Sequence, residues 1–507
     1  MIPMVPRMSR TNCRQCCYYG KAGQRSKLLI GCIGLILQTE RYSKGFGWRQ
    51  GLCRIAAYER VKSAWPSLRS CCPRQWNMKK TVVVLSLFLV VELVYQKSPV
   101  HYVEDSKYSL LMDEAILHQG TPNMLSYQVP RGTGPGFAAN GYSRNLALVK
   151  GRLIYGFPWG LPILTLPWVA VANALGQTVA PRHVYSAAKE VRMQRLATAF
   201  LSALTVCVAY EAAASLLPLS WSLAIALSVG FGTQMWSSVS RSLWPQTWYL
   251  LLITLIILLL MRGWHWPGLL ATLIAWAAFV RPVAAPTLLI LGVYILFELE
   301  SQQARVLYLA TGLLWAGALG AVMLFFVGQL LAPVYDPGLM VITGFLGRLV
   351  GILFSPARGL LVYVPVVVVP LYLTVRHWRQ LPQRRLAALA LAAVFSTIAT
   401  LACCRVWWGG WSYGPRDLVE TVPWLALLAI SGIKTFWDDS EITRNGRRIF
   451  TGAATLLLAA SIMMNAPGAL SRAAGFEWNA RPDVDTHPDR LWDWRHPQFL
   501  AWIQRTN

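Results

Sequence analysis

Charged residues are scarce in this chain, and acidic residues are the scarcest of them. Only 14% of the 507 residues are charged, and 22 Asp and Glu stand against 47 Lys and Arg. A soluble domain usually carries about a quarter charged residues, so this composition excludes an ordinary soluble enzyme. The formal charge of +25 would favour nucleic acid in a soluble protein, but no basic module with interleaved aromatic residues occurs. We therefore expect no nucleic-acid partner.

Motifs for metal binding and for nucleophilic catalysis are also missing. The seven histidines show no HxxH or HExxH spacing, and no GxSxG elbow occurs. The stretch "RGTGPGF" at 131–137 lacks the following Lys-Ser/Thr of a phosphate-binding loop. No metal site is predicted, and a divalent metal is the one cofactor left open.

Cysteine is rare outside the first 77 residues, where seven of the ten cysteines lie. The same segment holds fourteen Lys and Arg, and "CRQCC" has no second ligand pair that would complete a zinc site. A start at Met78 would place two lysines before an apolar run, in the manner of a signal anchor. We therefore expect 1–77 to be a basic, Cys-rich extension that is disordered or foreign to the natural protein.

Apolar residues are abundant: 55% of the chain is hydrophobic, there are 23 tryptophans, and mean hydropathy is +0.42. From position 78 onward, apolar runs recur at the length that a membrane-spanning helix requires. We predict an all-α polytopic membrane protein whose multi-span domain covers 78–466, followed by a tail over 467–507. The eleven predicted spans lie near 79–96, 196–217, 220–240, 246–261, 266–280, 283–299, 305–330, 359–376, 386–402, 418–435 and 449–466.

Basic clusters in the short loops set the expected orientation. "RHWRQLPQRR" and "KTFWDDSEITRNGRR" fall on the same side as Lys79 and Lys80, which predicts a cytoplasmic N-terminus. The long loop 97–195 and the tail 467–507 are then outside. Within that loop, "SKYSLLMDEAILHQG" predicts a short amphipathic helix on the membrane surface that ends at Gly120, with Asp113 and Glu114 on its solvated face. "FPWGLPILTLPWVAVANALG" predicts a second surface or re-entrant helix, since its prolines would weaken a full span.

Two acids, Glu104 and Asp105, follow the first predicted span by about eight residues. A carboxylate held there could act as a general base toward a hydroxyl or amine, or contribute to a metal site. The alternative is a solvated pair in which Asp105 caps the helix that comes next. Chemistry alone leaves both interpretations open.

Several arginines at predicted outer ends break the positive-inside rule. Guanidinium groups bind phosphate in a bidentate manner, so a set facing one cavity suits an anionic lipid head group. The alternative for each is snorkelling, or pairing with a carboxylate such as Asp417 or Glu420. These arginines are Arg241, Arg281, Arg348, Arg358, Arg405 and Arg416.

The stretch "RVWWGGWSYGPRDL" is a Gly-rich aromatic loop between two predicted spans. Trp411 and Tyr413 are the aromatic residues expected there as substrate contacts, because flat rings pack against sugars and prenyl chains. The alternative is an aromatic belt at the membrane interface.

The order of these stretches resembles the GT-C membrane glycosyltransferases. The resemblance is carried by "EDSKYSLLMDEAILHQG", "GRLIYGFPWGLPILTLPWVAVANALG", "FGTQMWSSVSRSLWPQ", "LFSPARGLLVYVPVVVVPLYL" and "WWGGWSYGPRDLVETVPWLALL". It covers 78 to about 435 and is closest to the bacterial proteins related to the protein O-mannosyltransferases and the aminoarabinose transferases.

The resemblance implies transfer of a sugar from a polyprenyl-phosphate donor to a lipid, glycan or protein acceptor, with inversion, at the outer face of a bacterial plasma membrane. It makes Asp105 the general base, with Glu104 its neighbour. It implies that Arg281, Arg358 and Arg416 bind the leaving phosphate. Tyr155 of "GRLIYGFPWG" is a further substrate-binding candidate. "SVSRSLWPQ" has no carboxylate where the family carries a second acid pair, so no bound ion is predicted. The rival interpretation is a transporter or flippase of a lipid-linked sugar, with membrane lipids as partners in either case.

Overall fold

The computed structural model describes residues 78–134, 136–335, 338 and 340–503. By internal contacts the chain divides into Met1–Met78 and Lys79–Asn507, and the second unit contains every element and site described for this protein. The basic, Cys-rich extension predicted over 1–77 lies outside the described residues.

The described residues are mostly helical and include one short β-hairpin. The helices are α4 (Met78–Lys97), α5 (Ser109–Gln119), α6 (Gly160–Ala174), α7 (Ala187–Ala213), α8 (Leu219–Phe231), α9 (Gln234–Ser237), α10 (Pro245–Met261), α11 (Pro267–Val280), α12 (Ala285–Glu298), α13 (Gln302–Phe326), α14 (Phe345–Phe354), α15 (Leu360–Tyr363), α16 (Val368–Arg376), α17 (Arg384–Cys403), α18 (Val422–Asp438), α19 (Arg444–Leu470) and α20 (Trp478–Ala480). The strands are β1 (Leu146–Val149) and β2 (Arg152–Tyr155), paired antiparallel.

Local sequence signals account for many helix boundaries. Pro245 and Pro267 occupy the first position of α10 and α11, where a missing N–H costs nothing. Ser301 and Thr443 cap α13 and α19 by accepting backbone N–H groups from the first turn. Gly120 ends α5 in the left-handed conformation, with φ of 67°, as its position after the apolar run predicts.

Every predicted span contains helix, but two are not continuous. The run at 220–240 was predicted as one helix, whereas α8 ends at Phe231 and the chain turns at Gly232 into α9. The run at 359–376 is divided into α15 and α16 by a 3-10 turn that begins at Pro365, because proline cannot donate the helical bond.

Five helices within the described residues are long and apolar enough to cross a membrane. They are Ala187–Ala213, Gln302–Phe326, Arg384–Cys403, Arg416–Asp438 and Arg444–Leu470. Six further apolar helices are shorter, at 10–17 residues. The all-α, membrane-type architecture is thus supported, while the count of eleven spans is not confirmed.

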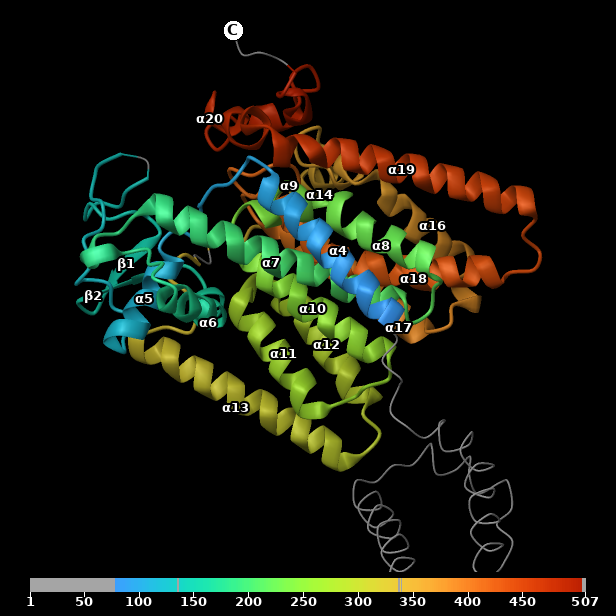
Figure 1. Cartoon of the computed structure of the whole chain (residues 1–507), viewed down its shortest axis with the longest axis horizontal. Coiled ribbons are helices and arrows are strands. Elements are labelled where there is room, and N and C mark those ends of the chain that lie inside the picture. The colour runs from blue at the N-terminus through green and yellow to red at the C-terminus, as the bar shows by residue number, and fades with distance from the viewer. Residues whose placement is uncertain (1–77, 135, 336–337, 339, 504–507) are drawn as a thin grey trace, which may run out of the picture. The chain divides into compact units, whose positions relative to one another are not determined.

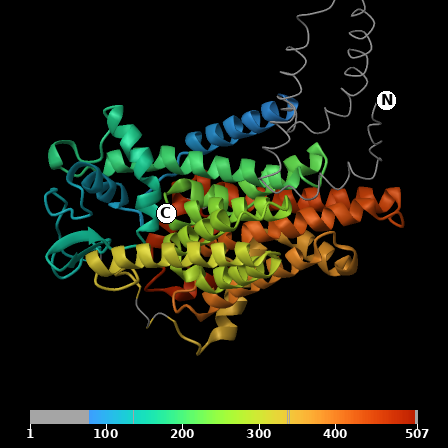
Figure 2. The ribbon, with the colours of Figure 1, turned by 90° about the horizontal axis from the view of Figure 1, so that it is seen from below.

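Burial separates inner from outer helices. Nearly all of α10 and α18 is buried, whereas α13 and α19 expose large apolar residues such as Leu313 and Leu456. Figure 1 shows α13 and α19 along opposite edges of the helical body, and the turned view in Figure 2 again places α13 at its surface. Helices that are apolar and exposed suit contact with lipid.

The segment 97–195 gathers α5, α6 and the hairpin at one end of this body (Figures 1 and 2). The hairpin turn uses Lys150 and Gly151 with positive φ, the geometry of a two-residue turn that matches strand twist. It was not anticipated from the sequence, and it ends at Tyr155.

The prediction that Asp113 and Glu114 lie on a solvated face of α5 is wrong. Asp113 and Glu114 are 0% and 1% exposed, because α5 packs against α6 and α7. Glu114 accepts hydrogen bonds from Thr178 Oγ1 and the Val179 backbone N–H. The first two turns of α5 are therefore buried in the protein and do not present an acidic face to water.

Candidate functional site

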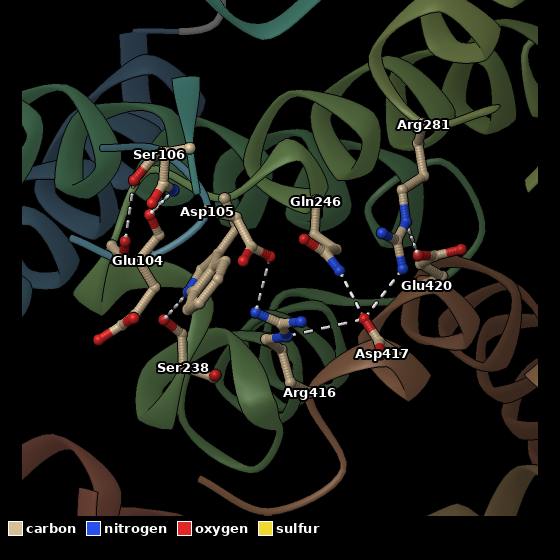
Figure 3. Close-up of polar contacts among 12 residues, drawn as sticks. Glu104, Asp105, Ser106, Ser238, Gln246, Arg281, Arg416, Asp417 and Glu420 are labelled. Atoms are coloured by element: carbon tan, nitrogen blue, oxygen red, sulfur yellow. Dashed lines mark hydrogen bonds and ion pairs between the residues drawn. The ribbon is translucent and has the colours of Figure 1, made fainter. Parts of the chain in front are cut away.

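The Asp105 carboxylate points toward Arg416, which is more than 300 positions later in the chain, whereas the Glu104 side chain points away from Arg416 (Figure 3). Arg416 NH1 donates to Asp105 Oδ2 at 3.2 Å; the side chains are 9% and 35% exposed respectively. The Arg416 guanidinium also stacks over Trp244, with its Cζ atom 3.9 Å from the ring centroid. Asp105 is thus a partly exposed carboxylate held by a nearly buried cation, with its second oxygen outside that ion pair.

Glu104 occupies a different environment from its neighbour. Its side chain is partly buried and accepts no hydrogen bond from the described residues. Burial raises the pKa of Glu104 to about 7; the adjacent Asp105 adds to the increase, while Arg416 and Lys107 oppose it. The Glu104 carboxyl group therefore changes its charge near neutral pH.

An alternating row of charges continues from Arg416 into the protein (Figure 3). Asp417 Oδ1 accepts from Arg281 NH2 at 2.9 Å and from Gln246 Nε2 at 2.8 Å. Arg281 Nε donates to Glu420 Oε1 at 2.5 Å. Arg416, Asp417 and Glu420 belong to one helical stretch, Arg416–Asp438, so a single element presents three charges. The Arg281 guanidinium is paired with two carboxylates, which is the alternative that the sequence left open for it.

The loop that carries the acids is fixed through its backbone. Tyr155 Oη donates to the Asp105 carbonyl oxygen at 2.5 Å, and Asn145 Nδ2 donates to that of Glu104 at 2.7 Å. Both partners come from the hairpin and the turn before it. Ser106 Oγ then donates to Gln194 Oε1 on α7 at 2.7 Å. The side chains of both acids remain free of these restraints.

Asp105 does not cap α5, so that interpretation is wrong. The residue at the helix start is Tyr108, and it makes no side-chain cap. Glu190 on α7 accepts the Tyr108 and Leu110 backbone N–H groups at 3.0 and 3.1 Å. The Glu190 carboxylate thus accepts the free N–H groups of the first turn of α5, and the Asp105 side chain pairs with Arg416 instead.

Arg358 is fully buried, and its hydrogen bonds hold the C-terminal tail. NH1 donates to Gln498 Oε1 at 2.5 Å, NH2 to Asn479 Oδ1 at 2.8 Å, and Nε to the Trp408 carbonyl at 2.9 Å. Gln498 also donates to the Ser412 carbonyl at 2.9 Å. The tail is therefore locked onto the aromatic loop that leads to Arg416.

The remaining substrate-binding candidates have mostly internal partners. Arg241, 1% exposed, donates to the Tyr95 carbonyl at 2.9 Å, and Tyr413 is buried with its hydroxyl on the Met464 carbonyl at 2.6 Å. Trp411 Nε1 donates to Asp483 Oδ1 at 2.9 Å, while Arg405 is exposed. Of all the candidates, the structure brings together Glu104, Asp105, Tyr155, Arg416 and, behind them, Arg281.

A small cavity lies beside this centre. It is lined by Ile352, Arg358, Leu401, Trp407, Trp408, Pro415, Arg416, Asp417 and Leu418. Its lining residues include the basic Arg358 and Arg416, the acidic Asp417 and the aromatic Trp407 and Trp408.

No family model and no curated protein matches the sequence. Within the described chain, no group of three or more His, Cys, Asp and Glu is arranged to hold a metal ion.

Several residues of the centre were not found from the sequence. Trp244 and Gln246 lie in "SLWPQ", directly after Arg241, whose charge is the more conspicuous feature of that stretch. Asn145 and Glu190 belong to no motif that indicates a functional role. His101, shortly before the acid pair, is partly buried, and this burial together with the nearby Arg241 and Arg195 lowers its pKa to about 3.

Replacing Gln498 with Ala is expected to destabilise the protein by about 1–3 kcal/mol, because it leaves buried donors and acceptors without partners. Gln498 Oε1 also accepts the Gly414 N–H at 3.1 Å, and its Nε2 donates to the Ala474 carbonyl at 3.0 Å. Thermal unfolding of the purified full chain measures the effect. The exposed Gln119→Ala is the matched control and is expected to unfold like the wild type. Equal melting temperatures for the two variants would contradict the locking role of Gln498.

Proposed function

We propose that the protein is a membrane glycosyltransferase that moves a sugar from a polyprenyl-phosphate donor to a lipid, glycan or protein acceptor. The observation that carries this proposal is the partly exposed Asp105 carboxylate, held by Arg416, which also lines a small cavity together with Arg358, Trp407 and Trp408. The setting is a body of apolar helices, which suits a donor with a lipid tail. The proposal places the centre at the outer face of a bacterial plasma membrane, with the N-terminus cytoplasmic and the C-terminus outside.

The proposed reaction divides the chemistry between two residues. Asp105 accepts the proton of the acceptor hydroxyl or amine as the new bond to the anomeric carbon forms. The bond between that carbon and the phosphate oxygen breaks on the opposite side, so the configuration inverts. The electron pair leaves on the lipid phosphate, whose developing charge requires cations already in place.

Arg416 is the cation best placed for that charge. Its Nε–H is buried and makes no hydrogen bond within the described residues; the nearest carboxylate oxygen, Asp417 Oδ1, is 3.7 Å away. Arg281 and Arg358 have their donors committed to protein partners. We therefore assign Arg281 and Arg358 to positioning, and Arg416 to both Asp105 and the leaving phosphate.

Transfer is expected to increase with pH through an apparent pKa near 7. The pKa of Glu104 is raised to about 7, so Glu104 gains its negative charge as pH rises through that value. Ionised Glu104 adds a second negative charge next to the centre toward which the proton of the acceptor moves, hence the rate rises rather than falls. Initial rates between pH 5.5 and 8.5 test this. Glu104→Gln is expected to remove the step near pH 7 while leaving the rate at its low-pH level; a step that persists would reject the role of Glu104.

The proposed function is tested with membranes from cells that express the full chain and from cells that do not. Radiolabelled sugar on polyprenyl phosphate is added, and label on endogenous lipid, glycan and protein acceptors is counted. Label that appears only with the protein supports the transferase. Movement of intact donor across sealed vesicles without any labelled acceptor would instead establish the transporter or flippase.

A further inference from the structure

A second cavity lies among α8, α16, α18 and α19, away from the acid pair. Its empty space is about 830 Å³, counting its open mouth. Its walls are almost wholly apolar, with Ile225, Val367, Leu425 and Leu458 among them. Neither the acid pair nor any arginine of the candidate site lines it, so binding in this cavity is independent of the proposed function.

One end of this cavity carries a polar side chain with nothing to bond. Gln234 lines the cavity and is 0% exposed, yet neither its Oε1 nor its Nε2 has a partner in the described part of the chain. Burying an amide without a hydrogen bond costs about 1–3 kcal/mol. The neighbouring Thr233 hydroxyl donates to the Val229 carbonyl at 2.7 Å, so of these two side chains only Gln234 lacks a hydrogen-bond partner among the described residues. An unpaired amide at the end of an apolar cavity fits a ligand with one polar group on a hydrocarbon chain.

The position of the cavity identifies the source of that ligand. Its walls include α18 and α19, both within stretches long and apolar enough to cross a membrane, and α19 is largely exposed. The surroundings of such a helix are hydrocarbon, so membrane lipid is the molecule at hand. Trp221 and Val229 both line the cavity and lie eight residues apart in α8, a helical length of about 12 Å at 1.5 Å per residue, and Gln234 follows after the turn at Gly232. One leaflet of hydrocarbon is about 15 Å deep, half of a 30 Å core.

We propose that this cavity binds one acyl chain of a membrane phospholipid, and that Gln234 Nε2 donates to the ester carbonyl at the head of that chain. The acyl chain runs from Gln234, at the start of α9, along α8 toward Trp221 and packs against α18 and α19. The ester carbonyl supplies the hydrogen-bond acceptor that the Gln234 amide lacks, while the apolar walls of the cavity separate the acyl chain from other lipids.

The proposal is tested by thermal unfolding of the purified, delipidated full chain in detergent, with and without dipalmitoyl phosphatidylglycerol. Lipid that binds the folded state raises the melting temperature. The wild type is expected to gain several degrees, and Gln234→Leu is expected to lose most of that gain. Ala429→Leu, which fills the cavity wall, is expected to lose it too. The matched control Ala310→Leu lies on the exposed side of α13 and is expected to keep the full gain.

Two outcomes would overturn the proposal. If Gln234→Leu gains as much from the lipid as the wild type and melts higher without lipid, the amide is simply unpaired and the cavity has no such ligand. If polyprenyl phosphate produces the Gln234-dependent gain and the phospholipid does not, the occupant is the isoprenoid chain. If Ala429→Leu disrupts the fold, its melting temperature without lipid is lower than that of the wild type. The effect of lipid on Gln234→Leu is then the result that tests the proposal.

Discussion

Asp105→Asn is expected to lower the rate of sugar transfer by about 10²–10⁴-fold, the usual contribution of a positioned general base. Asparagine keeps the shape of the side chain and can still accept a hydrogen bond from Arg416, which lies 3.2 Å away in the wild type. What it cannot do is accept the proton of the acceptor. Because the backbone contacts of this loop come from Tyr155 and Asn145, the loop itself is expected to stay in place.

Initial rates at saturating donor, normalised to the amount of folded protein, measure this effect. Asp113→Asn is the matched control, since Asp113 is an acid of the same segment that is fully buried and lies outside the proposed centre. We expect it to transfer sugar like the wild type. If Asp105→Asn retains more than a tenth of the wild-type rate, Asp105 is not the base.

Arg281→Met is expected to destabilise the protein by about 3–5 kcal/mol, the range for removal of one partner from a buried ion pair. Arg281 is 13% exposed, and its two carboxylate partners, Asp417 and Glu420, are 12% and 4% exposed. Removal of the guanidinium leaves Glu420 buried without an ion-pair partner and leaves Arg416 as the remaining cation beside Asp417. Arg416 contacts Asp417 at 3.7 Å and also pairs with Asp105, so the repulsion between the buried carboxylates also affects the Asp105 ion pair.

Thermal or denaturant unfolding in detergent tests this expectation. In the triple variant Arg281→Met, Asp417→Asn, Glu420→Met the buried charges are gone, and we expect most of the lost stability to return. The exposed pair Arg385 and Glu298 is the control, with 3.8 Å between its atoms and Arg385 88% exposed; Arg385→Met is expected to change little. Equal losses for Arg281→Met and Arg385→Met would contradict a structural role for the charged row.

The sequence predicted the position of the helices better than their length or burial. Each predicted apolar run contains helix, because a core or membrane helix needs such a run whatever it packs against. The continuous helix predicted over 220–240 was wrong because the fold requires a turn at Gly232, and hydropathy does not register turns made of apolar and hydroxyl residues. Likewise, Asp113 and Glu114 looked solvated by charge alone, whereas the packing of α6 and α7 around α5 encloses them.

For the site, the sequence supplied the residue types and the structure supplied the pairings. "ED" and "GPRD" each stood out, yet nothing local indicates that Asp105 and Arg416 meet, because this contact joins segments 311 positions apart. The same limit applies to Arg358: an outward arginine looked like a phosphate ligand, and only the folded tail shows that Gln498 and Asn479 take up its donors. Long-range partners decide whether a charge is free to act.

The most direct test is to quantify both products made by the purified full-length protein in liposomes supplied with a polyprenyl-phosphate-linked sugar and an acceptor extract. We predict that each sugar joined to acceptor is matched by one released polyprenyl phosphate, with inverted configuration, and that Arg416→Ala and Asp105→Asn abolish both products together. Release of polyprenyl phosphate that continues at the wild-type rate in both variants would contradict the account, because the Asp105–Arg416 centre would then have no part in the reaction.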